Sequence, residues 1–296
     1  MQFEVSTKNI DKDGVQMLFE AAEGGNAYYL SDAGDINRGK FITTDNNQGK
    51  KMAEGNLTFW RVSGKDVHYS DHSVGKTIRV NINAGGGLDG QQMNTWEDDP
   101  KYLWTDKDSR NAEFTYYLRA SEKVSGQGTA ANHVTCSSKF RGGTHTSNSH
   151  DPRASCCELV LRIGEGNASL DYHFEYNHPD YLNDGDGTSK LQANNETKIG
   201  QWFGRKTVVW TNGDGKSVTA RDYIDLDPFD VNGNPKNNWH ALHEKIFTTI
   251  RNYDVPPLWG GMFTSRVDGF QTVDYAIFSI REIRVPPIML TAVTEG

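Results

Sequence analysis

The chain has 296 residues, of which 24% are charged and 11% aromatic, and its formal net charge is −8 at pH 7. Aromatic residues spread along the whole length argue against a disordered chain, and the acidic balance argues against binding to nucleic acid or to a membrane surface. The longest apolar runs, such as IMLTAV near the C-terminus, are far too short to cross a bilayer as a helix.

Short runs of alternating polar and apolar residues follow one another along the chain, separated by glycine and by clusters of Asn and Asp. The clearest runs are 56–62, 76–83, 112–120, 133–140, 158–163, 170–176, 205–211 and 273–285. Alternation with a period of two is typical of strands that bury one face, and regular turn signals indicate a sandwich rather than βαβ units. We predict an all-β fold, a two-sheet antiparallel jelly-roll sandwich of concanavalin A-like type, with residues 1–296 forming one domain.

A Gly- and Ser-rich stretch at 139–153, KFRGGTHTSNSHDPR, carries Lys139 and Arg141 among its basic residues. Loops on a rigid sandwich commonly bear binding groups. One interpretation is therefore a basic lip that grips an acidic polymer. The alternative is a solvated loop whose charges keep the protein soluble.

Three strand-like segments follow at 155–163, 169–178 and 201–212. Successive side chains in a strand point to opposite faces, so each of the first two segments presents one polar face. The polar residues on these faces are Glu158, Arg162, Asp171, His173 and Glu175. A sheet lined by acids, an arginine and a histidine is suited to a polar ligand.

In the third segment, Trp202, Lys206 and Trp210 share one strand face. Aromatic rings stack on sugar rings, so a tryptophan in a groove is a carbohydrate signal, although tryptophan is also an ordinary core residue. We expect Trp202 and Trp210 to be the two tryptophans nearest a bound sugar.

An acidic stretch at 225–234, DLDPFDVNGN, offers oxygen ligands from Asp225, Asp227 and Asp230. Carboxylate and amide oxygens are the ligands that Ca²⁺ prefers. Asp, Asn and Gly also form such turns for backbone reasons alone, so a structural calcium site and a plain turn both stay open.

The next stretch, 238–252, has apolar residues three or four positions apart, which is typical of a helix. The same residues fit a strand followed by a loop. The three cysteines are also ambiguous, because Cys136 could bridge to Cys156 or Cys157 on a neighbouring strand, or all three could be small buried apolar residues.

The three segments at 155–212 resemble, in order, the signatures of the alginate-lyase type of jelly-roll polysaccharide lyases. That family carries R-S/T-E-L/V-R, then Q-I/V-H, then Y-F-K-A-G-V-Y-N-Q on neighbouring strands of one concave sheet. In CCELVLR, DYH and FGRKTVVWTN its Glu, His and Lys fall on Glu158, His173 and Lys206. The chain departs from the pattern where the family's two Arg, its Gln and its Tyr fall on Cys156, Val160, Asp171 and Trp210.

The resemblance implies cleavage of a uronic-acid polysaccharide by β-elimination. That reaction needs a cation that neutralises the uronate, a base for the α-proton and an acid for the leaving oxygen. His173 is the expected base, and Arg162 and Arg141 are the expected cations. Because the indole of Trp210 is not an acid of useful strength, we expect Tyr117 to serve as the acid. The residues expected to bind substrate are Lys139, Glu158, Asp171, Glu175, Lys206, Trp202 and Trp210.

Two other function classes stay open. A lectin-like carbohydrate-binding protein would use the same groove without a proton donor, and a glycoside hydrolase would use two carboxylates such as Glu158 and Glu175. In each case the expected partner is a polysaccharide, acidic for the lyase, and no cofactor is required beyond the open calcium alternative. The start of the chain, MQFEVSTKN, lacks the features of a secretion signal. The protein is therefore either cytosolic or has lost a signal, and a polysaccharide partner favours an extracellular location.

Overall fold

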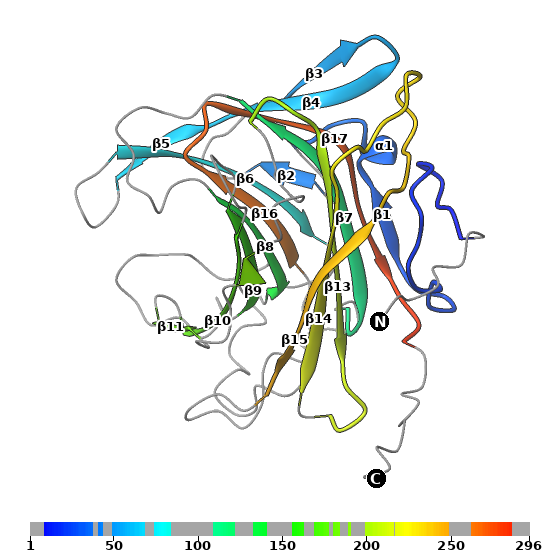
Figure 1. Ribbon diagram of the computed structural model, residues 1–296, viewed down its shortest axis with the longest axis vertical. Coiled ribbons are helices and arrows are strands. Elements are labelled where there is room, and N and C mark those ends of the chain that lie inside the picture. The colour runs from blue at the N-terminus through cyan, green and yellow to red at the C-terminus, as the bar shows by residue number, and fades with distance from the viewer. Residues whose placement is uncertain are drawn as a thin grey trace.

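Two antiparallel sheets, packed face to face, make up the fold (Figure 1). The computed structural model describes residues 9–37, 41–43, 49–68, 74–83, 109–121, 133–140, 156–162, 169–177, 180–183, 189–190, 199–215, 217–248 and 262–285. Of these, it describes the backbone alone for 42, 65–68, 74–77, 79, 81–83, 243, 262 and every described residue within 133–190. These ranges hold strands β1 to β17 and one short helix, α1 (Leu30–Ala33). The predicted all-β sandwich is confirmed. Within the same ranges no helix is long and apolar enough to cross a membrane.

The first sheet has eight strands. Its order is β15 (His240–Phe247), β14 (Val218–Asp225), β13 (Phe203–Thr211), β7 (Ala112–Ala120), β17 (Thr272–Glu282), β4 (Leu57–Ser63) and β3 (Gly49–Glu54), with β1 (Ala27–Tyr29) paired to β17. The stretch 238–252, ambiguous in sequence, begins with the edge strand β15. The strand interpretation is therefore confirmed over 240–247.

The second sheet has nine strands. Its order is β11 (Asp180–Asn183), β10 (Ser169–Asn177), β9 (Cys156–Arg162), β8 (His133–Phe140), β16 (Met262–Asp268), β6 (Val74–Asn83) and β2 (Phe41–Thr43). Two further strands join it, β12 (Ser189–Lys190) on β10 and β5 (Lys65–His68) on β6. Strands β8, β9 and β10 follow one another in the chain and lie side by side in this sheet.

The apolar core lies between the sheets. It is built from every second residue of β7, including Phe114 and Tyr116, and from Phe263 and Val267 of β16 on the opposite sheet. The rings of Phe114 and Phe263 meet across the interface with centroids 5.7 Å apart. Because neighbouring residues in a strand point to opposite faces, the remaining residues of these strands lie on the outer faces of the sandwich.

An ion pair is buried inside this core. Arg205 of β13 and Asp222 of β14 are both fully buried, with Arg205 Nη2 and Asp222 Oδ2 2.7 Å apart. Thr207 donates a further hydrogen bond of 2.9 Å from Oγ1 to Asp222 Oδ1. A charge buried without partners costs several kcal/mol, so these bonds are what make the pair tolerable in an apolar interior.

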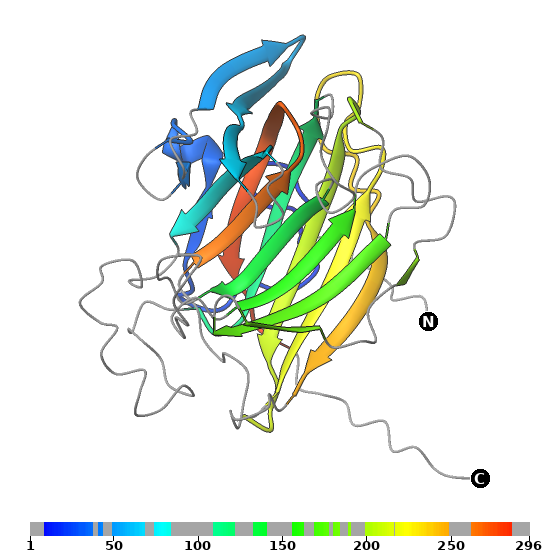
Figure 2. The same ribbon diagram turned by 90° about the vertical axis from the view of Figure 1, so that its left-hand side faces the viewer.

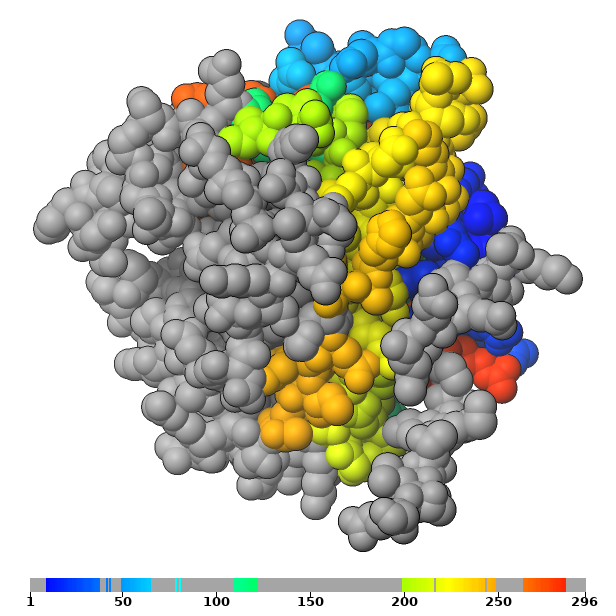
Figure 3. All heavy atoms as spheres, viewed as in Figure 1, coloured from blue at the N-terminus to red at the C-terminus, as the bar shows by residue number. Residues whose placement is uncertain are grey.

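The outer face of the eight-stranded sheet is covered by the chain itself. Leu18 and Phe19 pack against Trp210 and its buried neighbours, and Asn237 Oδ1 accepts a 2.7 Å hydrogen bond from the Gln16 backbone N–H. In Figure 3 the N-terminal residues, in blue, lie beside the yellow residues of the 226–239 segment on the right of the molecule. We call residues 9–20 the N-terminal strap.

Candidate functional site

The outer face of the nine-stranded sheet is the candidate site, and β16 shows which residues lie on it. Phe263 and Val267 belong to the core, and Ser265 Oγ lies 3.0 Å from the Tyr275 hydroxyl of the opposite sheet. The alternate residues Thr264 and Arg266 therefore lie on the outer face. Figure 2 turns this face to the viewer, with β16 in orange between β6 and β8.

A continuous row of polar positions crosses this face. Thr264 of β16 is paired through the backbone with Asn81 on one side and with Ser137 on the other. The pairing then continues across β9, β10 and β11. From β6 to β11 the row is Asn81, Thr264, Ser137, Glu158, His173 and Asn183, and beyond β6 it ends at the apolar Ile42 of β2. Every one of these positions is polar, although they come from six strands.

The adjacent row on the core side is mostly apolar, as alternation requires. Its members, in the same strand order, are Val80, Ser265, Cys136, Leu159 and Tyr172. The contrast between the two rows shows that the polar character belongs to one face of the sheet. The polar residues predicted on β9 and β10 lie on this outer face.

Two further rows on the outer face bring in charged residues. One runs Arg79, Arg266, Thr135, Val160 and Asp171, and the other runs Thr77, Asp268, His133 and Arg162. Glu175 is paired with Cys156 of β9 and with Tyr181 of β11. Lys139 lies in β8. The register thus gathers the predicted Glu158, Arg162, Asp171 and His173 into three neighbouring rows.

Arg266 and Asp268 are the charged side chains that sequence reasoning missed on this face. Arg266 Nε lies 2.9 Å from Asp268 Oδ2, and the side chain of Asp268 is 2% exposed whereas that of Arg266 is 21% exposed. Their sequence, SRVD, carries no motif, and they reach the site only because β16 inserts between β6 and β8. Long-range pairing of this kind leaves no local sequence signal.

The prediction that all three segments of 155–212 line one sheet is wrong for the third segment. β13 lies in the eight-stranded sheet, between β14 and β7. Lys206, Trp210 and Tyr117 lie on the outer face of that sheet, so the thickness of the sandwich separates them from His173. The structure does not bring these three residues to the predicted groove.

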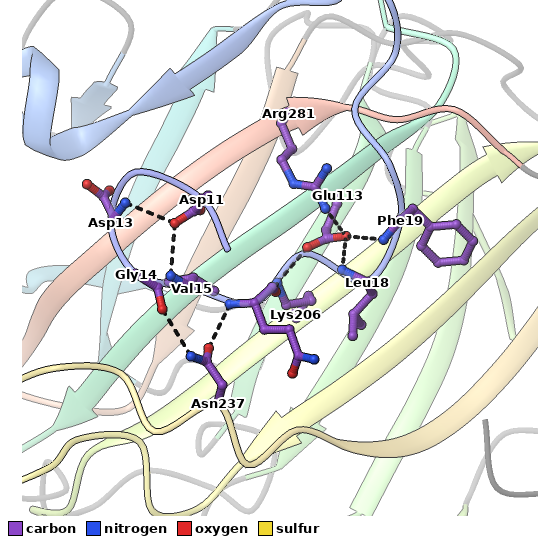
Figure 4. Close-up of polar contacts among 11 residues, drawn as sticks. Asp11, Asp13, Gly14, Val15, Leu18, Phe19, Glu113, Lys206, Asn237 and Arg281 are labelled. Atoms are coloured by element: carbon purple, nitrogen blue, oxygen red, sulfur yellow. Dashed lines mark hydrogen bonds and ion pairs between the residues drawn. The ribbon is translucent and has the colours of Figure 1, made fainter. Parts of the chain in front are cut away.

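Lys206 instead fixes the N-terminal strap (Figure 4). Its buried ammonium lies 2.5 Å from Glu113 Oε1 and donates a 2.8 Å hydrogen bond to the Gln16 carbonyl. Glu113 Oε2 also accepts hydrogen bonds from Arg281, at 2.5 Å, and from the Leu18 backbone N–H, at 3.1 Å. We call Glu113, Lys206 and Arg281 the buried charge cluster.

Burial and neighbouring charges shift the pKa values of Lys206 and Glu113. Burial lowers the pKa of Lys206 in spite of its contact with Glu113. Burial alone would raise the pKa of Glu113, but Lys206 and Arg281 hold that pKa below its ordinary value. Glu113 is therefore a carboxylate at neutral pH, able to accept hydrogen bonds from both cations and from the strap.

Tyr117 is poorly suited to donate a proton. Its side chain is fully buried, with ring centroids 5.1 Å from Phe229 and 5.5 Å from Trp239. Burial is the main cause that raises the pKa of its hydroxyl above the usual range. A buried hydroxyl of raised pKa on the far side of the molecule cannot protonate a substrate on the nine-stranded sheet.

The two tryptophans singled out by the sequence lie in β13 of the eight-stranded sheet (Trp210) and immediately before that strand (Trp202). Trp210 is buried against Phe19 of the strap, with ring centroids 5.7 Å apart. Trp202 is half-buried, with the Arg119 guanidinium 4.7 Å from its ring centroid and the Phe59 ring 5.6 Å away. Both tryptophans therefore have packing roles away from His173.

The acidic stretch forms turns closed by its own carboxylates. Asp225 accepts hydrogen bonds from the backbone N–H groups of Asp227 and Asn238. Asp227 forms an ion pair with Lys236, and Asp230 accepts the N–H groups of residues 232 and 234. Across the described part of the chain, no three His, Cys, Asp or Glu side chains gather closely enough to hold a metal ion.

Some predicted residues are described only in part or not at all. Arg141 lies outside the described residues. For Lys139, Glu158, Arg162, Asp171, His173 and Glu175, and for the three cysteines, the structure gives the backbone register alone. Their roles stay predictions.

Comparisons with known proteins give low similarity. No family model and no curated protein matches the chain. Among solved structures, alginate lyase Aly36B has a TM-score of 0.41 at 11% identity, with 90% of this chain and 94% of that chain covered. A Lotus tetragonolobus seed lectin has a TM-score of 0.41 at 8% identity, covering 88% and 100%. The exoplasmic/lumenal domain of VIP36 in its Ca²⁺-bound form has a TM-score of 0.39 at 10% identity, covering 84% and 86%. None of these values assigns the chain to a family or an activity.

Proposed function

We propose that the chain is a carbohydrate-active β-sandwich that binds a polysaccharide across the outer face of the nine-stranded sheet. The observation that carries this proposal is the unbroken polar row from Asn81 to Asn183. Thr264 of β16 is itself buried, but a polymer lying across the sheet would meet polar positions on the neighbouring strands, which are about 4.8 Å apart. Such a face suits a hydroxyl-rich ligand better than an apolar one.

We propose further that the protein cleaves a uronic-acid polymer by β-elimination. His173 is the base that removes the proton α to the carboxylate, and its register partner on β9 is Glu158. Arg162, in the next row but one, neutralises the uronate, and Arg141 assists from the 139–153 stretch. Neutralising the carboxylate lowers the cost of forming the carbanion-like transition state.

Tyr181 replaces Tyr117 as the proposed acid. Its position in β11 is paired with Glu175, and it lies two residues from Asn183, which is paired with His173. Diagonal neighbours in adjacent strands are about 7–8 Å apart at the backbone, within reach of a tyrosine hydroxyl. Tyr181 therefore lies on the same sheet as the base, where Tyr117 does not.

Binding without cleavage is the second candidate. The positions of Lys206 and Tyr117 favour it. Lys206, which the lyase resemblance aligned with the family's Lys, and Tyr117, the expected acid, both have structural roles on the other sheet. A lectin-like protein needs only the polar face and no acid or base. Because the same face would serve either function, an assay for cleavage is needed to distinguish them.

One experiment distinguishes the two. The protein is incubated with alginate and other uronic-acid polymers, while ultraviolet absorbance of the unsaturated product and polymer binding are both measured. For a lyase we expect absorbance to rise, and His173→Ala and Tyr181→Phe to lower the rate by about 10²–10⁴-fold with binding retained. Tyr117→Phe, a buried control, should keep the wild-type rate.

Other outcomes of this experiment would indicate a different function. Binding without any rise in absorbance supports the lectin-like function. Release of reducing sugars without that absorbance would mean hydrolysis, and a fully active His173→Ala enzyme would remove His173 as the base.

A further inference from the structure

We infer that the N-terminal strap is a lid that opens as one unit while the sandwich stays folded. Asn237 is the residue that holds this lid closed over the eight-stranded sheet. Because the strap lies on the sheet opposite the proposed carbohydrate-binding face, its opening does not depend on the proposed function. The closed form is the one seen in the structure, so opening is a rare excursion of the native protein.

The strap is a small hairpin with hydrogen bonds of its own. Ile10 and Gln16 form an antiparallel bridge. Asp11 closes the turn between them, because its Oδ1 accepts a 2.9 Å hydrogen bond from the Val15 backbone N–H. These bonds join residues that are close in sequence. They need no partner from the sheet, and the strap can therefore move as a unit.

Three side chains attach this hairpin to the sheet (Figure 4). Asn237 Oδ1 accepts a 2.7 Å hydrogen bond from the Gln16 backbone N–H, and Asn237 Nδ2 donates a 3.0 Å hydrogen bond to the Gly14 carbonyl. Lys206 donates to the Gln16 carbonyl, and Glu113 accepts backbone N–H groups of the strap. The described strand pairings do not involve these contacts, so the strap can lift without separating any strands.

The end of the strap is the hinge. The Arg284 backbone N–H donates a 2.8 Å hydrogen bond to the Glu20 carbonyl, and the Ala22 N–H donates a 3.0 Å hydrogen bond to the Glu282 carbonyl. These are backbone bonds to β17 and to the residues that follow it. They keep residues 20–22 in place when the contacts of Asn237, Lys206 and Glu113 break.

Asn237 has a backbone conformation that its side chain explains. Its φ is 60°, the only positive φ at a non-glycine position within the described ranges. A left-handed backbone costs a non-glycine residue free energy that glycine avoids. Glycine would therefore suit this backbone better. The advantage of asparagine lies in its amide, which binds the strap at Gly14 and at Gln16.

Little of the strap is buried. Val15 is its only buried residue, at 1% exposure, and Leu18 and Phe19 are only partly buried. In β7, by contrast, every residue except Arg119 is buried. Segments that bury few apolar side chains open at a lower free-energy cost than core strands do. The strap should therefore open far more often than the whole sandwich unfolds.

Opening also returns buried charges to water. Burial lowers the pKa of Lys206, so its charged form is less well stabilised there than in water. Arg281 Nη1 is buried with no hydrogen-bond partner in the described part of the chain. A buried ion pair gains from the attraction of its partners but loses the hydration of each ion. The regained hydration offsets part of the cost of breaking the strap's contacts.

Hydrogen exchange at several urea concentrations tests the lid, because it measures how often each amide is exposed in the native protein. The probes are the backbone N–H groups of Gln16, Leu18 and Phe19, compared with those of β7. The variant is Asn237→Gly, which keeps the left-handed backbone and removes the amide that binds the strap. The matched control is Asn238→Gly, which removes the exposed amide next to it.

We expect Gln16, Leu18 and Phe19 to share one free energy of opening and to exchange at least about a hundredfold faster than the amides of β7. Urea should change their exchange only weakly, because opening the strap exposes little surface, whereas exchange in β7 should rise steeply with urea. Asn237→Gly should speed exchange of the strap about tenfold, because it removes two hydrogen bonds. Asn238→Gly should change it by less than about twofold.

Three outcomes would overturn the inference. Equal exchange rates and equal urea dependence in the strap and β7 would mean that the strap opens only when the whole molecule unfolds. Exchange of the strap amides as fast as in an unstructured peptide would mean that the strap is not closed in solution. An effect of Asn237→Gly no larger than that of Asn238→Gly would mean that Asn237 does not hold the strap. None of these outcomes depends on polysaccharide binding, so the lid and the proposed function fail independently.

Discussion

At the residue scale, Glu113 joins two parts of the chain that are distant in sequence. Its carboxylate accepts hydrogen bonds from Lys206, from Arg281 and from the backbone of the N-terminal strap. Removing one partner of a buried ion pair leaves the other charge uncompensated. Glu113 therefore contributes to stability through the charges that it neutralises.

Glu113→Gln should lower the free energy of unfolding by about 3–5 kcal/mol, because it leaves two buried cations without a counter-charge. Chemical denaturation measures the change. The control is Glu244→Gln, which removes a half-exposed partner of Arg221 and should change stability by less than about 1 kcal/mol. Equal effects of the two variants would contradict the role given to the buried charge cluster.

Acid should weaken the same cluster. The folded-state pKa of Glu113 lies below its ordinary value of 4.5, so the folded state binds its proton less readily than the unfolded state does. Its contribution is therefore complete above about pH 4.5 and is lost as the pH falls through the folded pKa. Urea midpoints of the wild type and Glu113→Gln, measured from about pH 7 to about pH 3, should converge at the acid end. If the difference between the two urea midpoints did not change with pH, the ionisation of Glu113 would not contribute to stability.

Gly204 is required by packing rather than by a turn. A Cβ atom there would lie 2.6 Å from Tyr117 Cε1 and 2.8 Å from Trp239 Cη2, because both rings lie on the bare backbone of β13. Gly204→Ala should destabilise the protein by about 1–3 kcal/mol. Gly213→Ala, where a Cβ would meet nothing within 4 Å, is the matched control and should melt within a few degrees of the wild type. If Gly204→Ala left the stability unchanged, the two rings would have to move aside at little energetic cost.

At the scale of elements, strand positions could be predicted from sequence because alternation is a local property. The run at 112–120 coincides with β7, and the runs at 158–163 and 170–176 fall on β9 and β10. The partners of a strand are a long-range property. The lyase resemblance places β13 beside β9 and β10, yet β13 pairs with β7 and β14.

The same limit applies to the candidate site. The polar faces of β9 and β10 were visible in the sequence, because two residues of separation put side chains on one face. Arg266 was not visible, because its register partners Arg79 and Thr135 lie more than a hundred positions away in the chain. Lys206 looked like a ligand-binding cation, whereas burial under the strap gave it a structural partner.

At the scale of the whole molecule, the two sheets share one core. We expect a single cooperative unfolding transition, because neither sheet can keep its inner face buried after the other has left. Tryptophan fluorescence, which includes Trp210 under the strap, and far-ultraviolet circular dichroism should give the same denaturation midpoint. Two separated midpoints would contradict the prediction that residues 1–296 form one domain.

The N-terminal strap has a consequence for the order in which the protein is made. Gln16 bonds to Asn237, 221 positions later, and the Glu20 carbonyl accepts a hydrogen bond from the Arg284 backbone N–H. During synthesis on the ribosome the strap emerges long before these partners exist. It must remain undocked until almost the whole sandwich has been translated, so closing this face is a late step in folding, with the slow kinetics that contacts of high sequence separation impose.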